Sequence, residues 1–212
     1  NYIINKEVLK NTKNLKCLIT PSTGTNHIDI NYCKKNNIKL FSLSNTNDVK
    51  KIYASSEFTF LLSLFMIKKL KLGIKNAVNY NWRKNENLFR GSEISDKKIS
   101  IIGFGRIGRN LARYFQPFKA NVWAYDINKN NIPKYVTFSN NINKVILGSK
   151  IVIVCLKLNK DTYKFINKRI FDKMDKSTIF INTSRGEIID EKVLYEKLRR
   201  NKISGAALDV LS

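Results

Sequence analysis

Short apolar runs alternate with amphipathic stretches along the chain from position 98 onward. Short apolar runs bounded by polar or glycine positions are typical of buried strands, whereas apolar residues spaced three or four apart are typical of helices. Strands are predicted at residues 98–102, 121–125, 136–138, 151–155, 178–182 and 205–210. Helices are predicted at residues 106–115, 142–147, 167–174 and 191–200. The run 151–155 is apolar on both faces, as a parallel strand covered by helices must be. We therefore expect an α/β fold with a six-stranded, Rossmann-type doubly wound sheet.

The first part of the chain has a different arrangement. The pattern predicts a strand at 16–20, a loop at 21–26, a helix at 28–36 and a strand at 38–43, which make one complete βαβ unit. One long apolar helix is predicted at 54–72, followed by a polar, Asn-rich connector at 76–95 in which Trp82 is expected to pack on a neighbouring surface. The chain thus divides into a small unit at 1–50, a helix and connector at 51–97, and the main sheet at 98–212.

The strongest apolar stretch, residues 58–67, is interrupted only by Thr59 and Ser63. It falls short of the ~20 residues that span a bilayer, and no basic-then-apolar leader precedes it. The three cysteines, Cys17, Cys33 and Cys155, are odd in number and lack metal-ligand spacing. We expect a cytoplasmic protein with reduced thiols, no metal site and no membrane partner.

The formal net charge of +23 raises the alternative of a nucleic-acid-binding protein. The lysines are spread over nearly all predicted helices and loops, however, and form no stripe interleaved with aromatic residues such as single-strand binders use. Specific nucleic-acid binding is therefore disfavoured, and the charge is expected to attract anionic substrates and cofactors.

A glycine-rich turn follows the predicted strand 98–102, at Gly103, Gly105 and Gly108. Between a strand and a helix, this spacing is typical of a dinucleotide pyrophosphate site. The first glycine permits a tight turn, the second lets the backbone approach phosphate, and the third allows close helix packing. The amides that begin the following helix then face the anion.

Asp126 ends the next predicted strand and lies 23 residues after Gly103. An acid at this spacing accepts hydrogen bonds from the adenosine ribose and repels a 2′-phosphate, which favours NAD over NADP. The alternative is a turn residue that merely closes the strand.

In a doubly wound sheet, ligands bind outside the carboxyl ends of the strands. The residues expected at that edge are the glycine turn, Asp126, Leu156 and Lys157, residues 183–186, and Asp209. Arg185 at such a strand end can clamp a carboxylate or polarise a carbonyl with its guanidinium. The alternative for Arg185 is a solvated turn residue.

Together these residues resemble the D-isomer-specific 2-hydroxyacid dehydrogenases, within them the branch similar to D-3-phosphoglycerate dehydrogenase. The motifs that carry the resemblance are residues 22–29, 55–57, Trp82, 91–93, the glycine turn with Asp126, 182–186 with Asp190 and Glu191, and 207–210. The resemblance covers nearly the whole chain. It implies that the first unit is part of a smaller, flavodoxin-like substrate domain and that the protein forms a two-fold dimer through the long helix.

The resemblance also implies roles for individual residues. Arg185 would be catalytic and hold the carboxylate and carbonyl of a 2-hydroxy or 2-oxo acid. The backbone at Thr23, Gly24 and Thr25 would bind the same carboxylate. The residues implied in cofactor binding, besides the three glycines and Asp126, are Arg106 and Ile107 through their amides, Leu156, Thr183, and Asp209, which would orient the nicotinamide carboxamide. The implied reaction is hydride transfer between NAD and C2 of a small D-2-hydroxy acid such as 3-phosphoglycerate.

The chain departs from the family pattern at its end. The family places a glutamate about thirty and an acid/base histidine about fifty residues after the arginine, whereas this chain stops at Ser212, 27 residues after Arg185. The only histidine, His27, precedes the glycine turn and is expected at the substrate rim or in a structural role. We therefore expect a fragment that is inactive alone. The alternative function is an NAD(H)-sensing binding module of the same fold, because fold does not fix function.

Overall fold

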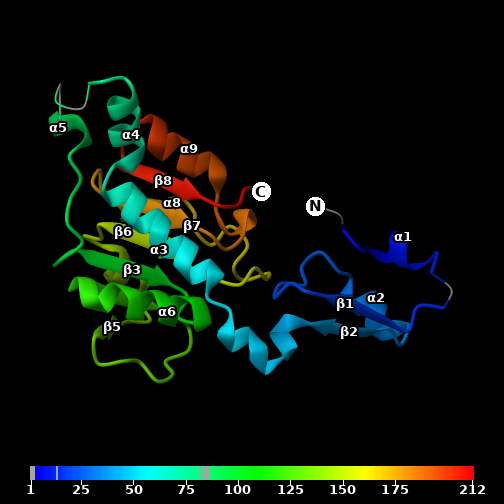
Figure 1. The fold of residues 1–212 in the computed structure, drawn as a ribbon. Helices are drawn as coiled ribbons and strands as arrows, with labels where there is room; N and C mark the ends of the chain where they lie inside the picture. Colours follow the sequence, from blue (N-terminus) through cyan, green and yellow to red (C-terminus); the bar gives the residue numbers. More distant parts are fainter. Residues whose placement is uncertain (1–2, 13, 82, 84–85) are drawn as a thin grey trace. The chain divides into compact units, whose positions relative to one another are not determined.

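A computed structural model describes residues 3–12, 14–81, 83 and 86–212 (Figure 1). The chain divides into two compact units, with the division between Ile52 and Tyr53. Trp82, which was expected to pin the connector, lies outside the described residues. Within the described part of the chain, no helix combines the length and apolar character needed to cross a bilayer.

The first unit contains the predicted βαβ arrangement. Strands β1 (Cys17–Thr20) and β2 (Lys39–Ser42) pair in parallel, and α2 (Ile30–Lys35) connects them. The short helix α1 (Lys6–Leu9) precedes them, and the 3₁₀ turns η1 (Leu43–Asn45) and η2 (Asn47–Lys51) follow. A small core of Leu9, Ile28, Cys33 and Ile38 holds this unit together.

The helix α2 begins two residues later than the pattern predicted. Asp29 is its N-cap and accepts a hydrogen bond from the Tyr32 amide at 2.9 Å. Ile28, the residue before the cap, instead forms a parallel bridge with Ile4. The backbone of Ile28 is extended in this bridge and cannot also be helical, so α2 begins after its N-cap, Asp29.

The second unit is built on one parallel sheet of six strands. They are β3 (Lys98–Ile102), β4 (Asn121–Tyr125), β5 (Val136–Phe138), β6 (Ile151–Val154), β7 (Ile179–Asn182) and β8 (Gly205–Leu208). Their order across the sheet is β5-β4-β3-β6-β7-β8, so the direction of winding reverses beside β3. This order confirms the predicted doubly wound fold.

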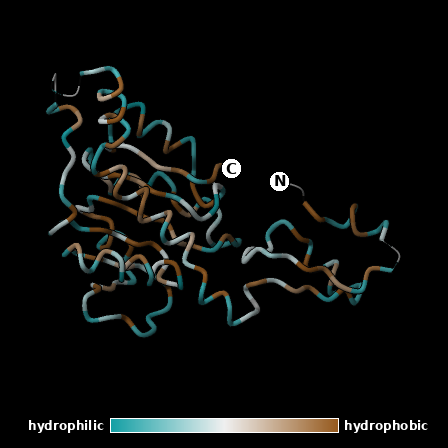
Figure 2. The backbone as a smooth tube through the Cα atoms, in the orientation of Figure 1, coloured by the Kyte–Doolittle hydropathy of each residue, from teal (hydrophilic) through white to brown (hydrophobic). Residues whose placement is uncertain are grey.

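Helices cover both faces of this sheet. The helices α3 (Ala54–Ile67) and α6 (Arg106–Phe115), with the 3₁₀ turn η3 (Gln116–Phe118), lie on one face, where Phe115 packs with Ile99 and Ile101 of β3. The helices α7 (Ile142–Ile146), α8 (Lys168–Phe171) and α9 (Glu191–Arg199) lie on the other, against Val152 and Phe180. Figure 2 shows the hydrophobic colour concentrated in the strands between these layers.

The predicted helix at 54–72 is wrong in its extent, because the structure breaks it into α3 and α4 (Leu70–Val78). Lys69 between them has a φ of 52°, in the left-handed region. The Ser92 amide donates to the Ile67 carbonyl at 3.0 Å, and Gly91 lies so close to Lys68 that a Cβ would stand 2.5 Å from its Cα. The returning chain thus occupies the space of the next helical turn.

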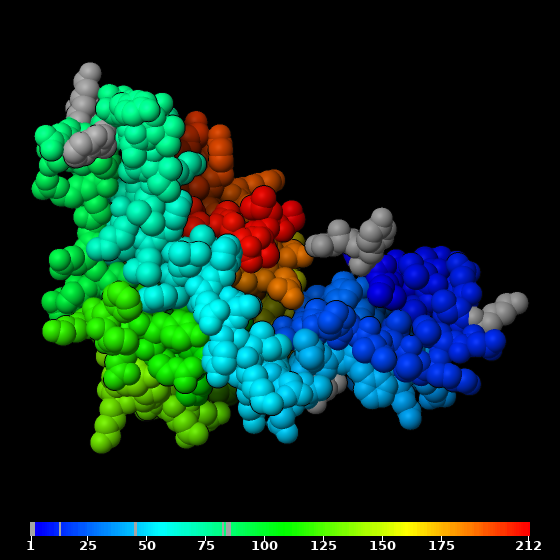
Figure 3. All heavy atoms as spheres, viewed as in Figure 1, coloured from blue at the N-terminus to red at the C-terminus, as the bar shows by residue number. Residues whose placement is uncertain are grey.

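The predicted connector at 76–95 is likewise only partly irregular. It includes the last turn of α4 and the short helix α5 (Glu86–Phe89). The helix predicted at 167–174 is shorter, since Asn167 is its cap and the residues after Phe171 form turns. In Figure 3, α3 and α4 cover the near face of the second unit beside the carboxyl-terminal residues.

Candidate functional site

The carboxyl ends of β3, β4, β6, β7 and β8 meet at one edge of the sheet, because all the strands run in parallel (Figure 1). Each of these ends carries at least one residue that the sequence singled out. They are Gly103 to Gly108 after β3, Asp126 after β4, Leu156 after β6, Thr183 and Arg185 after β7, and Asp209 after β8. The structure therefore brings the predicted residues of the second unit to a single edge.

The turn after β3 requires glycine at two positions. Gly103 has a φ of +97°, and a Cβ there would lie 2.6 Å from the Cys155 carbonyl oxygen. A Cβ on Gly108 would lie 2.3 Å from the Gly103 carbonyl oxygen. Both collisions are with backbone, so the turn and the start of α6 keep this close packing only with glycine.

Gly105, unlike Gly103 and Gly108, has room for a Cβ. It is exposed, and nothing lies within 4 Å of the position that a Cβ would take. It is also the N-cap residue of α6 and has no side chain that caps the helix. The positive end of the helix dipole, at Arg106 and Ile107, thus borders open space, which fits a phosphate group.

Asp126 holds the glycine turn from the side. Its Oδ2 accepts a hydrogen bond from the Phe104 amide at 2.7 Å, and its Oδ1 accepts one from the Asn128 amide at 3.0 Å. Each carboxylate oxygen has a second lone pair, so both can also accept from ribose hydroxyls. Asp126 therefore acts as a turn residue, and its carboxylate keeps lone pairs with which it can accept from a ligand.

The end of β6 is tied to β3, since the Cys155 amide donates to the Ile102 carbonyl at 2.7 Å. Burial raises the pKa of the Cys155 thiol to about 12. The thiol stays protonated at neutral pH and is no nucleophile. Leu156, which follows, is half-buried and offers an apolar surface.

The turn after β7 is held by Asn182, a fully buried residue whose role the sequence did not single out. Its side chain accepts from the Ser184 amide at 3.0 Å and donates to the Arg185 carbonyl at 2.9 Å. The Ser184 hydroxyl donates to the Val154 carbonyl at 2.8 Å. These bonds fix the backbone that carries Arg185.

Arg185 itself is half-buried, and its Nη1 donates to the Ser184 carbonyl at 2.7 Å. A guanidinium has five N–H donors, so this bond orients the group while most of its donors can still face an anion. Thr183, beside it, shares a hydrogen bond of 2.7 Å with Thr59 of α3. Asp209 is exposed, and its amide donates to the Asn182 carbonyl at 3.0 Å.

Thr23, Gly24 and Thr25 belong to the first unit, in the loop after β1. The Ser22 hydroxyl contacts the Thr20 hydroxyl at 3.2 Å and shapes this loop, and the Thr25 carbonyl accepts from the Ile28 amide at 3.0 Å. The loop thus follows the carboxyl end of its own parallel strand pair, the usual place for a ligand-binding turn.

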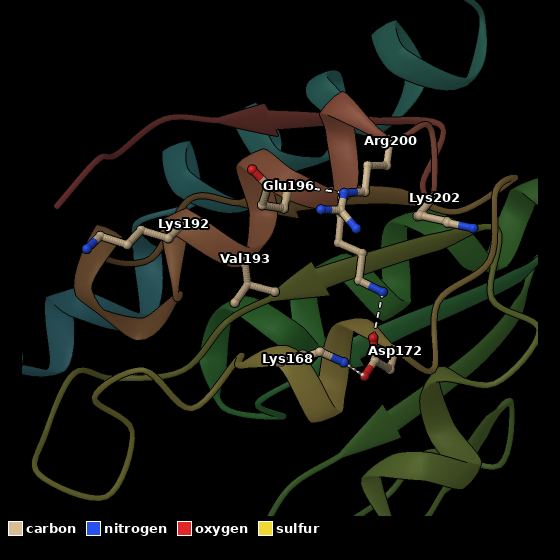
Figure 4. A pocket seen from close by; sticks show the side chains of 8 residues that line it. Lys168, Asp172, Lys192, Val193, Glu196, Arg200 and Lys202 are labelled. Atoms are coloured by element: carbon tan, nitrogen blue, oxygen red, sulfur yellow. Dashed lines mark hydrogen bonds and ion pairs between the residues drawn. The ribbon is translucent and has the colours of Figure 1, made fainter.

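A separate hollow of about 400 Å³ lies between α8 and α9 (Figure 4). The residues that line it are Lys168, Asp172, Lys192, Val193, Glu196, Lys197, Arg200 and Lys202. Hydrogen bonds from Lys168 at 2.6 Å and Lys197 at 2.7 Å lower the pKa of Asp172 to about 2. The Lys197–Asp172 contact joins α9 to the end of α8, and no predicted site residue lines the hollow. We therefore interpret the hollow as a structural contact between the two helices.

Among the described residues, no group of three His, Cys, Asp or Glu side chains is arranged to hold a metal ion. The polar groups at the strand ends are instead backbone amides, the carboxylates of Asp126 and Asp209, and the Arg185 guanidinium. This set can bind an anion or a sugar hydroxyl.

Comparison with known families gives two matches that together cover most of the chain. Residues 60–212 match the model described as the NAD binding domain of D-isomer specific 2-hydroxyacid dehydrogenases. Residues 1–52 match the model of the catalytic domain of the same family.

Similar proteins include D-3-phosphoglycerate dehydrogenase of Archaeoglobus fulgidus, 28% identical over 98% of this chain and 38% of its own length. Glyoxylate reductase of Thermofilum pendens is 32% identical over 98% of this chain and 61% of its own length. The chain therefore spans less than two thirds of the length of each of these relatives.

Two solved structures share the fold closely. D-lactate dehydrogenase from Aquifex aeolicus, complexed with NAD and lactic acid, is 27% identical with a TM-score of 0.87, over 99% of this chain and 62% of that one. The acyclic imino acid reductase Bsp5, in complex with NADPH and D-Arg, is 30% identical with a TM-score of 0.86, over 99% of this chain and 66% of that one.

Proposed function

We propose, from the premise that this chain belongs to the D-isomer-specific 2-hydroxyacid dehydrogenase family, that the protein transfers a hydride between NAD and C2 of a small D-2-hydroxy acid. One observation carries the proposal. The glycine turn, Asp126 and Arg185 lie at strand ends on the same edge of one doubly wound sheet. A dinucleotide site and a guanidinium suited to a carboxylate are thereby on one ligand-binding edge.

The chain's own residues fit the cofactor. The open space at Gly105 and the first amides of α6 would hold the pyrophosphate, and Asp126 would accept from the adenosine ribose. Leu156, Thr183 and Asp209 would line the nicotinamide half, because β6, β7 and β8 form the other half of the sheet. When bound, NAD supplies the hydride acceptor.

The substrate's anionic group is assigned to Arg185. A guanidinium binds a carboxylate through two parallel hydrogen bonds and stabilises charge on a neighbouring carbonyl oxygen. In the first unit, the backbone amides at Thr23 to Thr25 are proposed to bind substrate. Since the net charge is +23, we propose a small acid with a further anionic group, such as 3-phosphoglycerate.

Calorimetric titration with NADH and NADPH tests the cofactor assignment. We expect NADH to bind at least about tenfold more tightly, because the Asp126 carboxylate repels a 2′-phosphate. The matched variant is Asp126→Asn, which keeps an oxygen to accept from the Phe104 amide but loses the charge, and should narrow that preference. Absence of saturable NADH binding, or a preference for NADPH, contradicts the proposal.

We also propose that the protein is a homodimer through α3 and α4. Phe58, Leu61 and Ile74 are 42%, 54% and 58% exposed on these helices, more apolar surface than a solvated helix pair needs. Sedimentation velocity should show a dimer that Leu61→Glu dissociates. Tyr195→Glu, at a similarly exposed position on α9, is the control and should leave the dimer intact. A monomeric wild-type chain contradicts this proposal.

A cytoplasmic location is proposed from the cysteines. All three are free, and burial raises the pKa of both Cys33 and Cys155. Protonated core thiols suit a reducing compartment. Recovery of the protein in the membrane or secreted fraction of fractionated cells contradicts this assignment.

A further inference from the structure

The two polar interruptions of the apolar run in α3 are among the buried residues of that helix. Thr59 and Ser63 are both fully buried, whereas the apolar Phe58 and Leu61 on the same helix are exposed. The Ser63 hydroxyl is satisfied within the helix, where it donates to the Thr59 carbonyl at 2.8 Å. Only the Thr59 hydroxyl reaches out of the helix, to the end of β7.

The Thr59 hydroxyl has two partners and one proton. Its Oγ1 lies 2.6 Å from the Ser55 carbonyl oxygen and 2.7 Å from the Thr183 Oγ1. A carbonyl oxygen only accepts, so the Thr59 proton lies on the bond to Ser55. The contact with Thr183 is then a hydrogen bond only if Thr183 donates to Thr59.

This proton count decides what Thr183 can offer to a ligand. With its single proton directed at the buried Thr59, the half-buried Thr183 hydroxyl presents only lone pairs toward the strand-end edge. It can accept a hydrogen bond and cannot donate one there. The Thr183 hydroxyl therefore favours a ligand group that donates a hydrogen bond.

We propose that Thr59 is a positioning residue that makes Thr183 an obligate acceptor for a hydrogen-bond donor on the nicotinamide half of the dinucleotide. The inference rests on the proposed function, which puts the pyrophosphate at Gly105 and the adenosine ribose at Asp126. Because β7 lies on the other side of the sheet's switch point, its end belongs to the nicotinamide half. That half carries donors in its carboxamide NH₂ and its ribose hydroxyls.

The test measures binding of NADH and of ADP, which lacks the nicotinamide half, to the wild-type chain and to five variants. Thr59→Val removes the oxygen that accepts the Thr183 proton, so the Thr183 hydroxyl is no longer held as an acceptor for the ligand. We expect NADH affinity to fall about five- to tenfold, the size of one hydrogen bond. ADP affinity should stay within about twofold, which also shows that the sheet edge is folded. Thr59→Ser keeps the hydroxyl and should restore NADH binding. Ser63→Ala, which removes a buried hydroxyl from the same face, should have no effect.

Coupling to Thr183 separates positioning from a general packing loss. The double variant Thr59→Val/Thr183→Val should bind NADH no more weakly than Thr183→Val alone, because Thr59 acts on the ligand only through the Thr183 hydroxyl. The reduced 3-acetylpyridine analogue, in which a methyl replaces the carboxamide NH₂, identifies the donor. If Thr59→Val narrows the preference for NADH over this analogue, the donor is the carboxamide. An equal loss for both cofactors assigns it to the ribose.

Two different results would overturn the inference. Wild-type chain that binds neither NADH nor ADP overturns the proposed function and this inference with it. Wild-type chain that binds both, combined with a Thr59→Val variant of unchanged NADH affinity or with additive losses in the double variant, overturns the role of Thr59 alone.

Discussion

Gly103→Ala is expected to destabilise the second unit by roughly 2–5 kcal/mol. The left-handed φ of +97° costs an alanine about 1–2 kcal/mol, and forcing extra volume into a packed site costs about 1–3 kcal/mol more. The second cost applies because the new Cβ would stand 2.6 Å from the Cys155 carbonyl oxygen, which belongs to a neighbouring strand end and cannot rotate away.

Two other glycines provide matched controls. Gly148 has a φ of +71° but nothing within 4 Å of its Cβ position, so Gly148→Ala should lose only the backbone cost of about 1–2 kcal/mol. Gly105 has neither a positive φ nor a neighbour, so Gly105→Ala should change the free energy of unfolding by less than about 1 kcal/mol. Its methyl group fills the proposed phosphate space, and NADH affinity should fall.

The assay is urea denaturation followed by far-ultraviolet circular dichroism, together with NADH titration of each folded variant. The expected order of stability is Gly105→Ala above Gly148→Ala above Gly103→Ala. A Gly103→Ala variant as stable as Gly148→Ala would show that the contact with Cys155 is not tight. A Gly105→Ala variant with undiminished NADH affinity would show that the pyrophosphate does not bind at the start of α6.

Three further predictions follow from the site and its surroundings. Arg185→Ala should weaken oxamate binding to the NADH complex of the protein about 100-fold, because a charged, two-point contact is lost, and Arg185→Lys should recover only part of that affinity. Unchanged oxamate affinity would exclude Arg185 from the substrate site. Titration of the Asp172 carboxyl by nuclear magnetic resonance should give a pKa of about 2 that rises in Lys197→Met. Because folding lowers this pKa, the Asp172 carboxylate stabilises the fold when the pH is above 3.8, the ordinary pKa of an aspartate. That contribution should disappear as the pH falls toward 2. Iodoacetamide at pH 8 should modify the exposed Cys17 well before Cys155, whose pKa is about 12, as read by peptide mass spectrometry; equal rates would show that the Cys155 thiol is accessible.

The sheet was predictable because each strand is a short apolar run with polar or glycine boundaries. The predicted bounds of β3, β4, β5 and α6 coincide with the structure residue for residue. The break between α3 and α4 was not predictable, since the apolar pattern continues through it. It is set by the Ser92 amide and by Gly91, which come from another part of the chain.

The candidate site, too, could be predicted from the sequence only in part. The spacing of Gly103 and Asp126 is local to one βαβ unit, so the sequence alone predicted both. The contribution of Thr59 depends on which side of α3 packs on the sheet, and a helix that is apolar nearly all round does not reveal this. The signal available in the sequence was the pair of hydroxyl residues, Thr59 and Ser63, in an otherwise apolar run.

The bond from Asp126 to the Phe104 amide has a consequence for altering cofactor choice. The acid that we propose to discriminate against a 2′-phosphate also stabilises the loop proposed to bind the pyrophosphate, because it accepts a hydrogen bond from the Phe104 amide. A substitution that simply deletes this side chain to admit NADP strips an acceptor from a backbone donor in that loop. Cofactor selectivity and the rigidity of the loop therefore depend on the same side chain. A successful redesign must replace the carboxylate with a neutral group that still accepts a hydrogen bond from the Phe104 amide.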